Sequence, residues 1–320
     1  MKATNWNKAT PTSTMFWNQN IRQFWIDEEI PLSDDKLTWE IMSPVEQEVY
    51  KKVTAVLTRL DSAQASIGMP EIGLKIEDPI TKAIFSFMAM MEHMHAKSYS
   101  SIYSTLCKSS EIDELFDWVD NDLVTTEKLT KIQNLYQSIN LDNGKQDLYM
   151  ALTASVFLES FLFYSGFFYP LYMAGQGKLV ASGEIINLII RDESIHGVYV
   201  GMVAQELFNE FSPEEQEQLK RKTNELLQDL VEIEDRYTEQ VYSQVGLSEE
   251  VKTFVRYNAD KAMMNLNMEP VFNVDESQVN GQVIAGLDTK TKNHDFFSTK
   301  GNGYIKPTNI STLEDADFDF

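Results

Sequence analysis

The chain has 320 residues, of which 43% are hydrophobic and 24% are charged, a composition that excludes intrinsic disorder for its main part. Lys and Arg number 27 against 49 Asp and Glu, and the resulting net charge of −22 repels phosphates and anionic lipids, so we expect no nucleic-acid partner and no membrane partner. The single cysteine, Cys107, excludes an intramolecular disulfide, a thiolate zinc site and a Cys-x-x-Cys redox pair, and it suits a cytoplasmic protein.

Helix signals dominate from the N-terminus onward. The first 13 residues (MKATNWNKATPTS) lack the apolar core of a signal peptide. We expect the first 40 residues to wrap the remainder as an extended segment rich in aromatic side chains. Capping boxes begin helices at Ser43 and Ser212, and Gly68-Met69-Pro70 is expected to end the first of these helices. The predicted helices span residues 43–67, 78–107, 111–119, 125–138, 145–174, 182–208, 212–244 and 248–267.

The longest apolar run, residues 156–174, is nearly long enough to span a membrane but contains Glu159 and Pro170. A span needs roughly 20 apolar residues with few or no charges, so this run predicts a buried core helix. No stretch shows the alternation of a half-buried strand, which predicts an all-α fold. We expect one helical domain in residues 1–270 and a flexible C-terminal tail in residues 271–320. The tail ends in Phe318-Asp319-Phe320, which indicates either disorder or a docking peptide.

The informative residues are acids that share a helix face with apolar side chains. Asp61 lies four residues after Leu57 and therefore falls on the apolar stripe of the first long helix. Three further long helices each turn one acid toward their own apolar stripe: Glu92, Glu159 and Glu193. Burying an unpaired carboxylate costs several kcal/mol, so inward acids on four separate helices must share partners.

Two of these acids belong to Glu-x-x-His pairs, because His95 and His196 follow them by three residues on the same helix face. One such pair is a weak signal, and a lone inward acid is usually an edge residue with a buried stem. Together, however, four acids and two histidines match the ligand plan of ferritin-like dimetal carboxylate bundles. Four carboxylates balance two divalent cations, and the oxygen-rich set favours iron or manganese over structural zinc. The predicted ligands are Asp61, Glu92, His95, Glu159, Glu193 and His196.

Tyr99 lies four residues after His95, which places its phenol on the same face as the predicted ligands. A phenol in a dry pocket beside two redox-active metals could be oxidised to a radical that is protected from quenching. The ordinary alternative is a core tyrosine with a satisfied hydroxyl group. Its expected apolar neighbours come from two other helices: Phe163, Phe167 and Ile189.

Three segments carry a resemblance to a known family. Residues 92–100 (EHMHAKSYS), 157–161 (FLESF) and 190–197 (IRDESIHG) resemble the radical-generating small (β) subunit of class I ribonucleotide reductase, over nearly the whole chain. Within the family, the short N-terminus, residues 68–70 (GMP) and residues 293–304 (NHDFFSTKGNGY) are similar to the class Ib branch. No predicted ligand departs from the family pattern, so the resemblance disfavours a metal-free variant.

The resemblance implies roles that helical periodicity leaves open. It implies that Trp25 transfers electrons, that Asp192 links Trp25 to the ligand His95, and that Tyr304 passes the radical to the large (α) subunit. It also implies a homodimer whose C-terminal tail docks the large subunit. One cysteine cannot supply the redox thiol pair of ribonucleotide reduction, so the substrate chemistry would lie on that partner. The class Ib branch implies dimanganese activated through a small flavodoxin-like protein, with di-iron assembly as the alternative.

The resemblance thus implies a ribonucleoside-diphosphate reductase subunit in which Tyr99 holds the stored radical. Two other classes of protein stay open at this point. The first is a ferritin-like oxidase or desaturase, which would use the same ligands but needs neither the Tyr99 pocket nor a docking tail. The second is a purely structural helical protein, which would have to satisfy six buried polar groups without metal. Metal analysis separates the structural protein from the other two, and a tyrosyl radical signal separates the oxidase. The donor set does not decide between manganese and iron.

Overall fold

The computed structural model describes residues 3–139 and 144–287, and all regular structure in these two ranges is helical, without a strand. The all-α prediction is therefore confirmed. The α-helices are α1 (Pro11–Arg22), α2 (Asp35–Ile41), α3 (Pro44–Ala63), α4 (Met69–Lys75), α5 (Pro79–Leu106), α6 (Ser109–Asn121), α7 (Leu123–Ser138), α8 (Lys145–Phe157), α9 (Tyr164–Gly175), α10 (Val180–Phe208), α11 (Pro213–Tyr242), α12 (Ser248–Asn265) and α13 (Gly281–Leu287). Two π-helical turns join consecutive helices: η4 (Gln64–Gly68) and η5 (Leu158–Leu162). The 3-10 turns are η1 (Trp6–Lys8), η2 (Asp27–Glu29), η3 (Leu32–Asp34), η6 (Ser243–Val245) and η7 (Glu276–Gln278).

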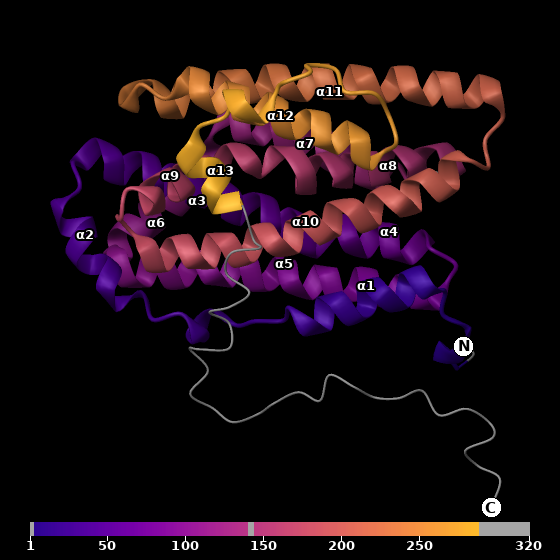
Figure 1. The fold of residues 1–320 in the computed structure, drawn as a ribbon, viewed down its shortest axis with the longest axis horizontal. Coiled ribbons are helices and arrows are strands. Elements are labelled where there is room, and N and C mark those ends of the chain that lie inside the picture. The colour runs from indigo at the N-terminus through magenta and orange to yellow at the C-terminus, as the bar shows by residue number, and fades with distance from the viewer. Residues whose placement is uncertain (1–2, 140–143, 288–320) are drawn as a thin grey trace, which may run out of the picture. The chain divides into compact units, whose positions relative to one another are not determined.

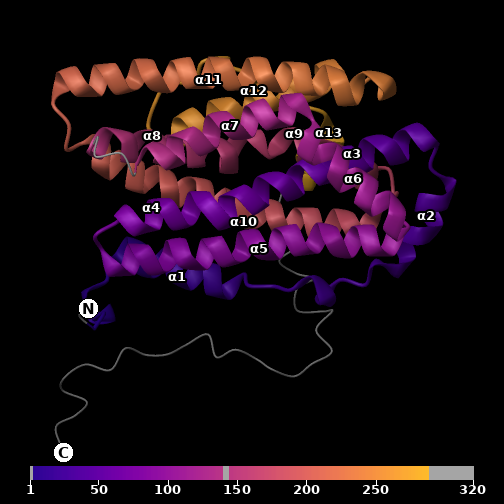
Figure 2. The ribbon, with the colours of Figure 1, turned by 180° about the vertical axis from the view of Figure 1, so that it is seen from behind.

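The long helices lie side by side along one common direction (Figures 1 and 2). α3 packs on α5, and α10 packs on both α8 and α9. α11 and α12 pair with each other on one side of this bundle, whereas α1 lies along α5 at the opposite edge. The helices predicted to carry the metal ligands are therefore neighbours in one bundle.

Local sequence signals explain where several of these helices begin. At α3, Ser43 Oγ accepts the backbone N–H of Glu46, and the Glu46 carboxylate accepts the backbone N–H of Ser43 at 2.8 Å. Ser212 and Glu215 form the same reciprocal pair at the start of α11. Both capping boxes satisfy backbone donors that would otherwise lack a partner, as the sequence predicts.

The predicted apolar stripes form the core of the bundle. On α3, Val53, Leu57 and Leu60 are buried together with Asp61. α3 approaches α9 so closely at Gly166 that a Cβ atom on this residue would lie 2.6 Å from Leu57 Cγ. Burial of one such aliphatic side chain contributes about 1.5–3 kcal/mol, so apolar packing holds the helices around the buried acids.

The first long helix continues beyond its predicted end. The sequence predicts a stop at Gly68-Met69-Pro70, but the π-helical turn η4 leads into α4, which ends only at Lys75. Pro70 lies in the first turn of α4, where its missing N–H group costs little. Proline therefore marks the start of a new helix here and does not end the helical path.

The start of α10 also differs from its prediction. The sequence predicts Ser182 as the N-cap, but the helix begins at Val180. Asp35 lies 146 residues before Ala181 in the chain. Its carboxylate accepts hydrogen bonds from the backbone N–H groups of Ala181 at 3.0 Å and of Ser182 at 2.7 Å. The cap is thus a tertiary contact, which local sequence patterns do not reveal.

The N-terminal segment wraps the bundle as predicted, but it is not extended throughout, since it contains α1 and α2 (Figure 1). Thr10 caps α1 by accepting the backbone N–H of Ser13 at 3.0 Å. Lys97 of α5 pairs with Asp27 and Glu28 of the turn η2. These ion pairs fasten the N-terminal segment to one of the helices that carry predicted ligands.

One helical run of the described chain, Lys145–Gly175, is long and apolar enough to cross a membrane by length and composition. Its most apolar window is entirely buried inside the protein, where it packs against α3, α10 and α12. The predicted core helix is therefore confirmed.

Residues 288–320 lie outside the described residues, and with them Tyr304, Phe318 and Phe320. The described part of the predicted tail includes η7 and α13, and α13 packs on α9. The boundary at residue 270 and the docking role of the tail stay predictions.

Candidate metal centre

Four helical elements bring the six predicted ligands into one buried group. Asp61 lies near the end of α3, Glu159 lies in η5, and the two Glu-x-x-His pairs lie on α5 and α10. All six side chains are completely buried. Their ligand atoms form two sets, and within each set all of them lie within 4.8 Å of one another: Asp61, Glu92, His95 and Glu193, and Glu92, Glu159, Glu193 and His196.

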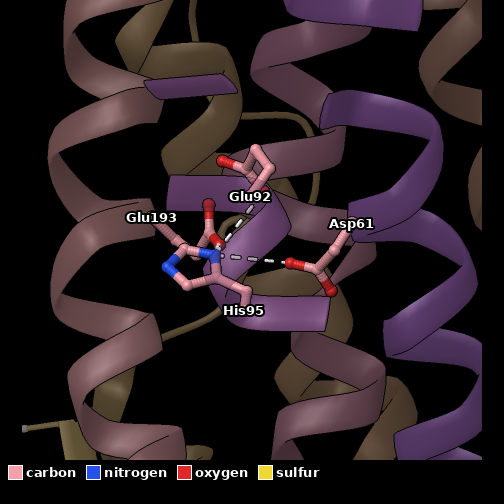
Figure 3. A group of neighbouring side chains, drawn as sticks. All are labelled: Asp61, Glu92, His95 and Glu193. Atoms are coloured by element: carbon pink, nitrogen blue, oxygen red, sulfur yellow. Dashed lines mark ion pairs between the residues drawn. The ribbon is translucent and has the colours of Figure 1, made fainter. Parts of the chain in front are cut away.

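His95 Nδ1 lies among the carboxylates of the first set (Figure 3). It is 2.9 Å from Glu193 Oε1, 3.4 Å from Asp61 Oδ1 and 3.5 Å from Glu92 Oε2. These carboxylates come from three different helices and converge on one nitrogen atom. The other ring nitrogen of His95, Nε2, has a different partner.

His196 Nδ1 takes the corresponding place in the second set. It is 2.8 Å from Glu92 Oε1 and 3.5 Å from both Glu159 Oε2 and Glu193 Oε2. The centroids of the two imidazole rings are 6.1 Å apart. Asp61 therefore belongs to the His95 half of the group, and Glu159 belongs to the His196 half.

Glu92 and Glu193 belong to both halves. Each of them turns one carboxylate oxygen toward His95 Nδ1 and its other oxygen toward His196 Nδ1. A carboxylate divided in this way between two imidazoles can bridge two cations. The arrangement is typical of a dinuclear centre in a helical bundle.

The donor atoms of this group are also free to bind metal ions, because most of them make no hydrogen bond to another described residue. Both oxygens of Asp61, Glu92 and Glu193, and Nδ1 of both histidines, are buried without a hydrogen-bond partner among the described residues. Only two imidazoles face the four carboxylates, and unbalanced buried charge is costly, so the group needs further positive charge between its members. Two divalent cations would balance the four carboxylates and use the oxygen-rich donor set that manganese and iron accept.

The charges of the group perturb one another strongly. Burial raises the pKa of Asp61 and of Glu159 well above the ordinary range of a carboxyl group. Burial alone would lower the pKa of His95, but Glu193, Asp192 and Asp61 raise it well above its usual value. Metal binding would resolve this conflict, since it favours ionised carboxylates and neutral imidazoles.

His95 connects the group to a buried chain of polar side chains. Its Nε2 atom lies 3.2 Å from Asp192 Oδ2, and the same oxygen accepts the indole N–H of Trp25 at 2.7 Å. Trp25 is buried, and its ring is nearly parallel to that of His95, with centroids 6.2 Å apart. The three residues that the resemblance connects therefore lie together, while their role in electron transfer stays a prediction.

Tyr99 lies on the buried face of α5, and its hydroxyl group has no hydrogen-bond partner among the described residues. Burial raises the pKa of its phenol well above the usual value, and the carboxylates of Asp61 and Glu193 raise it further. The phenol is therefore protonated and shielded from solvent. The apolar neighbours predicted for it are also completely buried: Phe163, Phe167 and Ile189.

Two glutamines that are absent from the sequence prediction contact Asp192 and the predicted ligand Glu159. Gln23 donates a hydrogen bond to Asp192 Oδ1 at 2.8 Å, and Gln64 donates one to Glu159 Oε1 at 2.5 Å. Gln64 follows the predicted ligand Asp61 by three residues and so shares its helix face, a spacing that could have identified it. Gln23 lies outside every predicted helix and carries no comparable signal.

Comparison with known proteins assigns this chain to a family. Residues 3–280 match the family model described as ribonucleotide reductase, small chain. The chain belongs to the ribonucleotide reductase small-chain family. A ribonucleoside-diphosphate reductase subunit beta from Bacillus subtilis (strain 168) is 52% identical over 320 residues, covering 99% of this chain and 96% of the relative. The ribonucleoside-diphosphate reductase 2 subunit beta of Escherichia coli (strain K12) is 38% identical over 322 residues, covering 100% and 98%.

Solved structures of the family have the same fold. Dimanganese(II)-NrdF from Streptococcus sanguinis has a TM-score of 0.85 and 44% identity, covering 90% of this chain and 99% of that chain. The ribonucleotide reductase R2 subunit from Clostridium botulinum has a TM-score of 0.78 and 26% identity, covering 86% and 88%. The recognition made from the motifs at residues 92–100, 157–161 and 190–197 is confirmed, as are the ferritin-like fold and the assignment to an oxidoreductase.

Proposed function

We propose that this chain is the radical-generating small subunit of a class Ib ribonucleoside-diphosphate reductase, with a dinuclear metal centre beside a radical-forming tyrosine. The observation that carries the proposal is the sharing of Glu92 and Glu193 between two histidines, because it provides for two adjacent ions. A structural helical protein has no use for this arrangement, since without metal four buried carboxylates would share only two imidazoles.

The residues that would hold the ions are Asp61, Glu92, His95, Glu159, Glu193 and His196. Asp61 with His95 would serve one ion, Glu159 with His196 would serve the other, and Glu92 and Glu193 would bridge them. When bound and oxidised by dioxygen or a reduced oxygen species, two manganese or iron ions would supply the one-electron oxidising power that this function requires. Manganese is favoured because a relative of the same fold is described as a dimanganese(II) protein. Iron is the alternative, since imidazole and carboxylate donors accept both metals.

Tyr99 is the residue that would be oxidised. It would lose one electron and its hydroxyl proton and become a neutral tyrosyl radical. The hydroxyl group is completely buried and has no hydrogen-bond partner among the described residues, so water and reductants do not reach it. The chain itself therefore supplies the shielding that a stored radical needs.

Transfer of the radical to the substrate would use two other parts of the chain. Asp192 holds the indole N–H of Trp25 and faces His95 Nε2, which makes a continuous buried path from the N-terminal segment to the metal ligands. Tyr304 would continue the path toward the large subunit, where the ribonucleotide is reduced. Its position in a segment with glycines on its N-terminal side suits transfer better than storage.

The family supplies the partners of this proposal. Relatives are described as subunit beta, which supports a large (α) subunit as partner and a homodimer of this chain. The acidic C-terminus with Phe318 and Phe320 would dock the large subunit through its aromatic anchors. A small flavodoxin-like protein would activate the manganese form, in the cytoplasm.

The test combines metal analysis with electron paramagnetic resonance (EPR) on protein from its native host. We expect two metal ions per chain and a tyrosyl signal in the wild type, and two ions without a stable tyrosyl signal in Tyr99→Phe. Tyr103→Phe is the matched control, because Tyr103 is equally buried one helical turn away and donates its hydroxyl group to Thr54 Oγ1 at 2.8 Å. A stable radical in Tyr99→Phe, or its loss in Tyr103→Phe, would show that Tyr99 is not the radical site.

A further inference from the structure

Glu159 differs from the other three carboxylates of the metal centre. Neither oxygen of Asp61, Glu92 or Glu193 has a hydrogen-bond partner among the described residues. Glu159 Oε1, in contrast, accepts a hydrogen bond from Gln64 Nε2 at 2.5 Å, and only Oε2 is left facing His196. In the His196 half of the centre, the ligand Glu159 is therefore held by a hydrogen bond from the neutral side chain of Gln64.

Gln64 is itself held in one orientation. Its amide nitrogen donates a second hydrogen bond to Ser155 Oγ at 2.8 Å, and its amide oxygen accepts the hydroxyl proton of Tyr136 at 2.7 Å. Gln64, Ser155 and Tyr136 are all completely buried. Both N–H groups and the oxygen of the amide are thus used, and a flipped amide would place its oxygen against a carboxylate oxygen.

The backbone around this network is adapted to it. Gln64 begins the π-helical turn η4, and Glu159 lies in the second π-helical turn, η5. π-helical turns are rare and frequently occur at functional sites. At the end of η4, a Cβ atom on Gly68 would overlap Gln64 Oε1 and lie 2.7 Å from Tyr136 Cε2. Glycine at this position leaves the space that the glutamine and the tyrosine occupy.

We propose that Gln64 and Tyr136 are positioning residues for the metal centre: Tyr136 fixes the Gln64 amide, and Gln64 holds Glu159 Oε1 so that Oε2 points to the His196 half. This inference rests on the proposed function, which it deepens by making the two metal positions unequal. Glu159 is held on one oxygen and offers the other to an ion, whereas Asp61 offers both of its oxygens.

A neutral amide suits this task for an electrostatic reason. A lysine or arginine in its place would also hold Glu159, but its positive charge would repel the neighbouring cation. The amide donates a hydrogen bond to the carboxylate without adding charge to the centre. Outer partners of this kind orient metal ligands, and their removal typically weakens metal binding by about 10–100-fold.

The experiment is a titration of the metal-free protein with Mn(II), in which EPR measures free Mn(II) and gives the affinity of each ion. Gln64→Met keeps the length of the side chain but removes the amide, and we expect one of the two ions to bind about 10–100-fold more weakly. Tyr136→Phe removes one hydroxyl group, and we expect about 2–10-fold weakening of the same ion. The EPR spectrum of the fully loaded Mn(II) pair should change in both variants, which a merely structural role would not cause.

Tyr242→Phe is the matched control for this series. Tyr242 is equally buried, and its hydroxyl group donates to the backbone oxygen of Ser165, outside the network. Its substitution should leave both Mn(II) affinities within about twofold of the wild type, since it removes one neutral hydrogen bond that no ligand and no member of the network shares. Equal weakening in this control and in Tyr136→Phe would overturn the proposal.

The remaining outcomes separate this inference from the proposed function. A wild type that binds fewer than two ions would overturn the dinuclear centre, and the inference with it. A wild type that binds two ions, together with a folded Gln64→Met protein that binds both as tightly, would overturn the positioning role alone. If Gln64→Met does not fold, Tyr136→Phe decides: unchanged affinities and an unchanged spectrum in that variant would refute the proposal.

Discussion

A buried ion pair between α7 and α11 allows a quantitative test of the packing. Lys128 and Glu234 form a direct ion pair, and neither side chain has any exposed surface. Lys128 Nζ also lies 4.4 Å from the centroid of the Tyr237 ring. Removing one partner leaves a buried charge alone, so Glu234→Leu and Lys128→Met should each cost about 3–5 kcal/mol of unfolding free energy.

The double variant separates a charge effect from a packing effect. With both charges replaced by apolar side chains of similar volume, the net change should be about zero or stabilising, because the desolvation penalty of both ions disappears. Urea unfolding followed by circular dichroism measures all three variants, and manganese content serves as the control for an intact metal centre. Single variants that cost less than about 1 kcal/mol, or a double variant that costs as much as the two singles together, would refute this reasoning.

Four predictions concern the function. Glu193→Ala should keep its helical circular dichroism but lose at least one metal ion per chain, because both halves of the centre lose an oxygen donor; full occupancy would remove Glu193 from the site. Asp192→Asn should lower metal affinity by at most about 10–100-fold but abolish turnover with the large subunit, and normal turnover would contradict its place on the transfer path. Tyr304→Phe should keep the tyrosyl EPR signal and lose turnover, whereas deletion of residues 313–320 should keep signal and metals but lose binding to the large subunit in a surface plasmon resonance assay.

Regular spacing along single helices made most of the site predictable. Glu92 and His95, three residues apart on α5, had to share a face, and so did Glu193 and His196 on α10. Asp61 and Glu159 were recognisable as acids on apolar stripes. Because unpaired buried acids cost free energy, these helix faces were expected to meet at one point. The structure does bring all six side chains together.

Contacts between distant segments could not be predicted in the same way. Asp35 caps α10 from the N-terminal segment, and Gln23 reaches Asp192 across 169 positions of sequence. Neither residue differs locally from an ordinary surface acid or amide. The ion pair of Lys128 with Glu234 was missed for the same reason, because each residue alone is typical of an exposed helix position.

The π-helical turn η5 sets how the long run Lys145–Gly175 tolerates insertions and deletions. A π-helical turn holds about one residue more than an α-helical turn over nearly the same rotation, so it accommodates an extra residue while α8 and α9 keep their buried faces aligned. Deleting one residue within η5 should therefore give an unbroken α-helix in which these faces are nearly retained. Deleting one residue from the middle of α8 would instead rotate the part before the deletion by about 100° relative to α9. The core could then keep the contacts of that part of α8 or the close approach of Gly166 to Leu57, but not both. A change of one residue in length is therefore tolerated by the packing within η5 and disruptive elsewhere in the run.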